Sequence, residues 1–65
     1  MYRVQYFCPR QSPYWQDLTE SVLLIFRRPQ TFQTFEEAQR ACNGLLWQFH
    51  GARVIDEAGQ EVYRI

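Results

Sequence analysis

Residues 34–51 read TFEEAQRACNGLLWQFHG, and this stretch predicts the helix around which the rest of the chain must pack. Thr34 and Glu37 have the spacing of a capping box, in which the threonine hydroxyl accepts a hydrogen bond from the amide at position 37. At 100° per residue, the apolar side chains fall on one face of this helix. They are Phe35, Ala38, Cys42, Leu45, Leu46 and Phe49. Gly51 is expected to follow the helix in the left-handed conformation.

The segments on either side of the helix have the composition of strands. Residues 2–8 alternate between two faces and are rich in aromatic and β-branched side chains. A loop marked by two prolines, residues 9–17, separates them from a second apolar segment, residues 18–28. After the helix, residues 52–57 and 60–65 predict a hairpin with a glycine in its turn.

The predicted order of elements is ββαββ within a single domain, residues 1–65. One helix can cover one face of a four-stranded antiparallel sheet, so the expected fold class is α+β, a two-layer sandwich. Because residues 18–28 are apolar on both faces, a shift of one residue would invert their orientation. The core residues expected from this arrangement are Val4, Tyr6, Val22, Leu24, Phe26, Phe35, Ala38, Cys42, Leu45 and Phe49.

Composition excludes several classes of protein. Aromatic residues make up 17% of the chain and apolar residues 46%, which is incompatible with an intrinsically disordered chain. Seven arginines balance seven acidic residues, so the chain lacks the positive charge of a generic nucleic-acid-binding tail. The longest apolar run, residues 22–26, is far shorter than the about 18–20 residues of a membrane helix. The N-terminus has no apolar signal-peptide core, so we expect a cytoplasmic protein with no membrane partner.

Two motifs give the chain a resemblance to a group of known proteins. The first is FQTFEEA, residues 32–38, at the start of the predicted helix, and the second is ARVIDEAG, residues 52–59, in the closing hairpin. Together they resemble small, uncharacterised bacterial ββαββ proteins that start their helix and close their hairpin in the same way. The motifs cover about half of the chain and are structural, a cap and a turn. The resemblance therefore supports the fold and implies no activity, substrate or cofactor.

Catalytic and metal-binding chemistry is poorly represented. The only soft metal ligands are Cys8, Cys42 and His50, and none forms a closely spaced pair of the zinc-binding kind. Cys42 is expected to fill core volume on the apolar face of the helix. Cys8 with His50 and Asp17 or Asp56 could be imagined as a nucleophilic triad, but nothing in the sequence brings them together. The expected protein is therefore not an enzyme and has no catalytic residue, metal, cofactor or small-molecule substrate.

The apolar side chains exceed what one helix can cover, and this surplus predicts an interaction surface. The sheet face opposite the helix is expected to carry Phe7, Leu23 and Ile25, and a contiguous exposed apolar patch usually marks an interaction site. Trp15 and Trp47 complete the predicted partner-binding set, although Trp15 could equally fold back over the sheet. The predicted function is a small protein-interaction or structural module. It is expected to form a homodimer through that sheet face or to bind another protein.

The alternative function is binding of single-stranded nucleic acid. Aromatic side chains on a sheet surface, beside arginine, can stack on unpaired bases. The side chains that could do so are Tyr2, Tyr6, Phe7, Tyr63, Arg3, Arg27, Arg28, Arg53 and Arg64. Seven acidic residues, however, cancel the positive potential that phosphate binding requires, which makes this the weaker interpretation.

Overall fold

The structure is a computed structural model that describes residues 1–23, 25–45 and 50–65. In this part of the chain it has one helix and seven strands, so the α+β class is confirmed but the simple ββαββ order is not. No helix in the described ranges is long and apolar enough to cross a membrane. The elements are β1 (Tyr2–Phe7), β2 (Gln16–Asp17), β3 (Thr19–Val22), β4 (Phe26–Pro29), β5 (Thr31–Phe32), α1 (Phe35–Asn43), β6 (Gly51–Ile55) and β7 (Glu61–Arg64).

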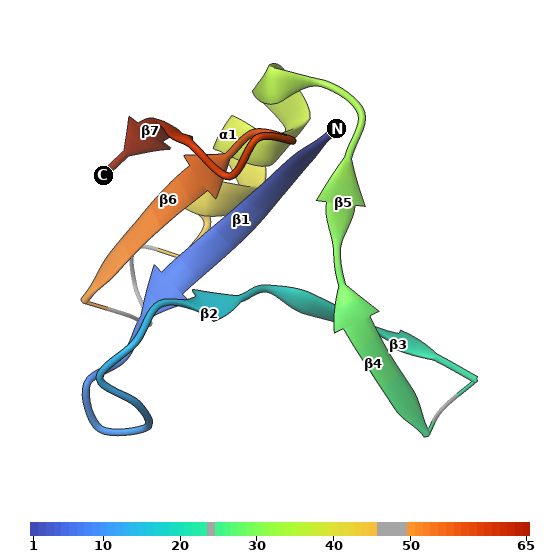
Figure 1. The fold of residues 1–65 in the computed structure, drawn as a ribbon, viewed down its shortest axis with the longest axis vertical. Helices are drawn as coiled ribbons and strands as arrows, with labels where there is room; N and C mark the ends of the chain where they lie inside the picture. The colour runs from blue at the N-terminus through green and yellow to red at the C-terminus, as the bar shows by residue number, and fades with distance from the viewer. Residues whose placement is uncertain (24, 46–49) are drawn as a thin grey trace.

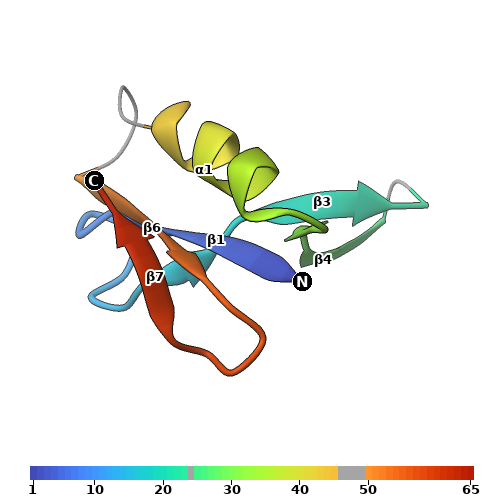
Figure 2. The same cartoon turned by 90° about the horizontal axis from the view of Figure 1, so that it is seen from above.

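The main sheet is built around β1 and β6 and is antiparallel throughout. Its order is β2-β1-β6-β7, and β5 also pairs with β1. Val4 lies opposite Val54 and faces α1, which covers this side of the sheet (Figures 1 and 2). Because side chains alternate along a strand, Gln5 and Arg53 point to the other side, which we call the open face. The open face carries Arg3, Gln5, Phe7, Asp17, Arg53, Glu61 and Arg64.

Strands β3 and β4 form a hairpin that projects from the main sheet (Figure 1), and we call residues 19–29 the arm. The sequence predicted a single strand over residues 18–28, and this prediction is wrong. The chain reverses instead at Leu23, which adopts a φ of 55°, so that Val22 pairs with Phe26. A positive φ is uncommon for a bulky side chain, and the five consecutive apolar residues contain none of the usual turn formers.

Helix α1 begins where the sequence predicted and ends earlier. The Thr34 hydroxyl accepts a hydrogen bond from the Glu37 amide at 3.2 Å, which confirms the cap. The helix ends at Asn43, and the Gly44 amide donates to the Arg40 carbonyl at 3.1 Å. The prediction that Gly51 closes the helix is wrong, because Gly51 is the first residue of β6. A glycine inside an apolar helical pattern is a weak stop signal, since tertiary contacts often override its helix propensity.

The closing hairpin is confirmed. Strands β6 and β7 pair antiparallel, and Gly59 supplies the positive φ, 82°, of the turn between them. A carboxylate oxygen of Asp56 accepts hydrogen bonds from the amides of Ala58 at 3.0 Å and Gln60 at 2.9 Å. These local bonds fix the turn and therefore the register of β7 on β6.

A small core lies between α1 and the main sheet. Its buried members are Val4, Ala38, Cys42, Ala52 and Val54. The sequence predicted Val4, Ala38 and Cys42, and these are confirmed. It omitted Ala52 and Val54, although both occur in a strand that was expected. Since β6 is a central strand, its helix-facing residues are covered on that side by α1 and on both edges by neighbouring strands.

The remaining predicted core residues have other environments. Phe35 and Leu45 pack against the edge of the core, whereas Tyr6 and Val22 are only half-buried. The prediction for Phe26 is wrong: its side chain is 64% exposed, because it lies on the arm and away from α1. Leu24 and Phe49 lie outside the described residues, so these two predictions stay untested.

Candidate interaction surfaces

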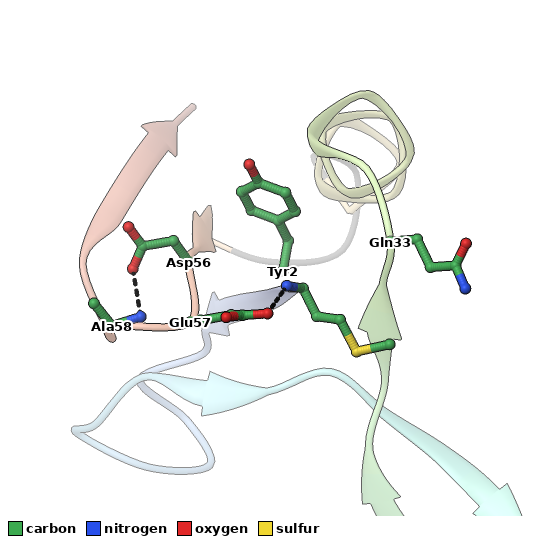
Figure 3. A pocket seen from close by; sticks show the side chains of 6 residues that line it. Tyr2, Gln33, Asp56, Glu57 and Ala58 are labelled. Atoms are coloured by element: carbon green, nitrogen blue, oxygen red, sulfur yellow. Dashed lines mark hydrogen bonds and ion pairs between the residues drawn. The ribbon is translucent and has the colours of Figure 1, made fainter.

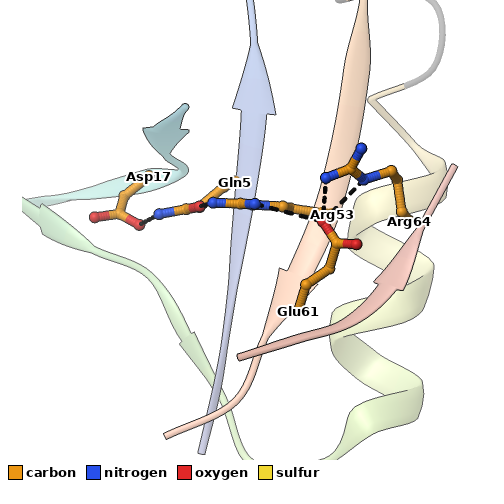
Figure 4. A network of polar contacts seen from close by, with 5 residues as sticks. All are labelled: Gln5, Asp17, Arg53, Glu61 and Arg64. Atoms are coloured by element: carbon orange, nitrogen blue, oxygen red, sulfur yellow. Dashed lines mark hydrogen bonds and ion pairs between the residues drawn. The ribbon is translucent and has the colours of Figure 1, made fainter. Parts of the chain in front are cut away.

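The open face is occupied by a continuous network of polar side chains (Figure 4). Gln5 lies at its centre and donates to an Asp17 carboxylate oxygen at 3.0 Å. Arg53 donates to the Gln5 side-chain oxygen from Nε at 2.9 Å and from Nη2 at 2.7 Å. Strands β2, β1 and β6 each supply one of these three residues, so pairing of the strands places the groups within reach.

The network ends at Glu61, which is shared by two arginines. Arg64 donates to Glu61 Oε1 from Nε at 2.8 Å and from Nη2 at 2.6 Å, and Arg53 Nη1 lies 3.4 Å from the same oxygen. Hydrogen bonding from Arg64, supported by the charges of both arginines, lowers the pKa of Glu61 below its usual value. At the other end of the network Arg3 contacts Asp17 at 3.4 Å. Each of the three arginines on the open face thus has an acidic neighbour.

Trp15 lies over this network. The Arg53 guanidinium carbon is 4.4 Å from the centre of its ring and that of Arg64 is 5.3 Å away, distances typical of cation–π contacts. The Phe7 ring is tilted against the indole with 5.7 Å between ring centres. Gly51 lies next to the indole, because a Cβ atom there would be 3.4 Å from Trp15 Cη2, an ordinary van der Waals distance.

The arm carries the most exposed aliphatic side chains of the described chain. Leu23 is 80% exposed and Ile25 is 81% exposed, and both lie at its tip. Towards the base the arm is polar: Arg28 pairs with Glu20 at 2.9 Å. Arg27 donates to the hydroxyls of Thr19 at 2.8 Å and Ser21 at 3.0 Å. The arm therefore combines a hydrogen-bonded polar stem with an apolar tip.

The predicted partner-binding residues fall into two groups. Phe7 and Trp15 lie together on the open face, in contact with each other. Leu23 and Ile25 were expected on the same face, and that placement is wrong, because the reversal at Leu23 carries them out on the arm. Trp47 lies outside the described residues. Whether any of them binds a partner stays a prediction.

Two side chains that matter for these surfaces were not in the predicted partner-binding set. Phe26 was assigned to the core but belongs to the exposed end of the arm. Arg53 links the two halves of the open-face network. The alternation of residues 52–57 already placed Arg53 opposite the helix-facing residues of its strand, so this position could have been identified from the sequence. The bonds that Arg53 makes to Gln5 and Glu61 could not be identified in this way, because they depend on the order of the strands in the sheet.

The hollow beside the N-terminus has a volume of about 500 Å³ and is wide open (Figure 3). The Met1 ammonium group pairs with Glu57 across its floor, and Asp56 is held by the amide of Ala58. Gln33, on the opposite rim, points away from these carboxylates. Both acidic side chains are already engaged by their own chain, so the hollow offers no evident chemistry for a ligand.

The two cysteines have different environments in the described part of the chain. Cys42 is fully buried in the core, and burial raises the pKa of its thiol to about 11. Cys8 follows β1, and the His50 amide donates to the Phe7 carbonyl at 3.0 Å, so the backbones of Cys8 and His50 lie close together. Both cysteines are free, and no group of three or more potential metal ligands occurs among the described residues.

Comparison with protein-family models, with curated proteins and with solved structures gave no match for this chain.

Proposed function

We propose that this chain is a protein-interaction module that binds its partner through the apolar end of the arm. One observation carries the proposal: two aliphatic side chains, Leu23 and Ile25, are about four-fifths exposed on a hairpin that projects from the folded body. Phe26, next to them, is also mostly exposed. Contiguous exposed apolar surface of this kind marks sites of association.

The energetics of the arm favour a partner. An isolated two-stranded hairpin is at best marginally stable in water, and the arm pairs with no strand of the main sheet. Complete burial of a leucine, isoleucine or phenylalanine side chain contributes about 1.5–3 kcal/mol. Covering Leu23, Ile25 and Phe26 would therefore contribute several kcal/mol to binding and would also stabilise the arm.

The open face is the less favourable contact surface, although the sequence had suggested it. Its arginines and acids satisfy one another, and a partner that displaced these bonds would leave charged groups without a counterpart. Trp15 already covers Phe7, which would otherwise be the main apolar contact. The apolar surplus expected from the sequence is concentrated on the arm instead.

Binding of single-stranded nucleic acid remains the alternative and has weaker support. The Trp15 ring, the best base-stacking surface on the open face, is occupied by Arg53 and Phe7. Asp17 and Glu61 reduce the positive potential beside it. We expect no salt-dependent rise in the fluorescence anisotropy of a labelled single-stranded oligonucleotide at low salt, and steep salt-dependent binding would favour the alternative.

Site-specific photo-crosslinking in the cells that make the protein tests the proposed function. A photoreactive amino acid replaces Leu23 at the tip of the arm, and the matched control replaces Gln33, which is exposed on the body. The proposal expects a protein adduct from position 23 that is absent from position 33 and is lost when Ile25 is also changed to Ser. Equal labelling from both positions, or no adduct from position 23, would refute it.

A further inference from the structure

We infer that the partner of the arm is a second copy of this chain, paired with it antiparallel along β3 across a two-fold axis at Ser21. This inference rests on the proposed function and adds the identity of the partner. Two copies joined in this way form a four-stranded sheet, β4-β3-β3-β4. Three or more strands are what an exposed hairpin needs for stability.

The exposed edges of the molecule differ in their ability to accept another strand. The outer strand β7 has an irregular register between Val54 and Ile55, and Glu61 and Arg64 on it are bonded to each other. Short length, charged side chains and bulges are the features by which edge strands resist pairing. The edges of β2 and β5 are only two residues long, so the arm offers the longer edges that remain for another strand.

The β4 edge is poorly suited to a second copy. In a two-fold antiparallel pair of identical strands, one residue lies opposite itself. With the axis at Arg27 or Arg28, two guanidinium groups would face each other, and like charges directly opposite destabilise a sheet. Pro29 also has no backbone amide to donate, and proline is confined to the unpaired edges of sheets.

The β3 edge is suited to a second copy. With the axis at Ser21, the two serines face each other and Glu20 faces the partner's Val22, so no like charges meet. With the axis at Glu20, two carboxylates would face each other, and with the axis at Thr19 or Val22 only that end residue would face the partner's β3, so Ser21 is the favoured centre. Glu20 keeps its ion pair with Arg28 in either arrangement, because that pair joins β3 to β4.

This register also brings Leu23, at the exposed tip, towards the partner, whereas Phe26 lies on the outer strand β4. Leu23 follows the last residue of β3, where the chain turns, and comes near the partner's Thr19 and Leu18, the latter packed against its core. Each apolar tip thus reaches the body of the other copy. The Val22–Phe26 pair of each arm lies on the same face of the joined sheet as that of the other, because a two-fold axis perpendicular to a sheet preserves its faces. Each contact between the two copies therefore occurs twice, once on either side of the axis.

A charge-swap experiment tests the partner and the register together. Ser21→Arg and Ser21→Glu each place like charges on the axis, whereas a mixture of the two places opposite charges there. We expect wild-type protein to sediment at about twice 7.9 kDa, each variant at 7.9 kDa, and the mixture again at twice that mass. Gln33→Arg and Gln33→Glu, exposed but outside the arm, should leave the wild-type mass unchanged. Far-UV circular dichroism verifies that the variants are folded.

Disulfide trapping gives an independent readout of the register. Directly opposite residues of antiparallel strands have Cα atoms about 4.5–5.5 Å apart, within the range that a disulfide spans. In a Cys8→Ser background, Ser21→Cys should form a covalent dimer with oxidised glutathione, which accepts the two electrons. Thr19→Cys lies two residues from the axis, too far from its counterpart in the other copy, and should not form a covalent dimer. The inference would be overturned if Thr19→Cys, and not Ser21→Cys, formed the covalent dimer. It would also be overturned if Ser21→Arg and Ser21→Glu each still sedimented as a dimer. Monomeric wild type would also overturn it, whereas the proposed function would still stand if position 23 crosslinks to another protein.

Discussion

Replacing Trp15 with Ala should destabilise the fold by about 2–3 kcal/mol. The tilted contact with Phe7 is expected to contribute about 0.5–1.5 kcal/mol. The contact with Arg53 at 4.4 Å adds about 0.5–1 kcal/mol at a partly exposed site, and loss of the half-buried indole surface supplies the rest. In a domain of 60–100 residues, 1 kcal/mol shifts the Tm by about 4–8 °C, so we expect a Tm lower by about 10–20 °C.

Tyr14→Ala is the matched control, because it removes the neighbouring aromatic side chain, which is 75% exposed. It should change the unfolding free energy by about 0.5 kcal/mol or less. Urea titration followed by far-UV circular dichroism avoids dependence on tryptophan fluorescence, and both variants should be measured at one protein concentration, since association shifts apparent stability. If Trp15→Ala is no less stable than Tyr14→Ala, then Trp15 does not stabilise the open face and is free to bind a partner.

Three further predictions concern the core, the helix cap and the network. Cys42 should stay unmodified by iodoacetamide at pH 8 in folded protein while Cys8 reacts, because burial keeps Cys42 protonated; peptide mass spectrometry that finds Cys42 alkylated first would contradict this. Thr34→Ala should lower the unfolding free energy by about 1 kcal/mol, and the exposed Thr31→Ala by much less; equal effects in urea titrations would argue against the cap. The stability difference between wild type and Glu61→Gln should be largest near neutral pH. It should shrink as the pH falls through the lowered pKa of Glu61, because a depressed carboxyl pKa stabilises the fold only while the group is ionised. A difference that stays constant from pH 7 to pH 3 in denaturant titrations would refute that role.

The sequence by itself determined the features that depend on hydrogen bonds between residues a few positions apart. The cap at Thr34 and the turn at Gly59 depend on side-chain and backbone groups three to four positions apart, so both could be predicted without the rest of the chain. Helical periodicity placed Ala38 and Cys42 in the core for the same reason. The interactions that fix these features are specified by neighbouring residues.

Only the tertiary structure decided the surfaces on which function is proposed. The apolar run from Val22 to Phe26 favours an extended strand, and its reversal at Leu23 became evident only from the pairing of β3 with β4. The docking of Trp15 over Arg53 likewise requires strand order, because the two residues are 38 positions apart in sequence and meet only when β2, β1 and β6 lie side by side. Such contacts depend on which strands become neighbours in the sheet. Strands that pair across a long sequence separation leave no periodic pattern in the sequence, so their pairing could not be predicted from it.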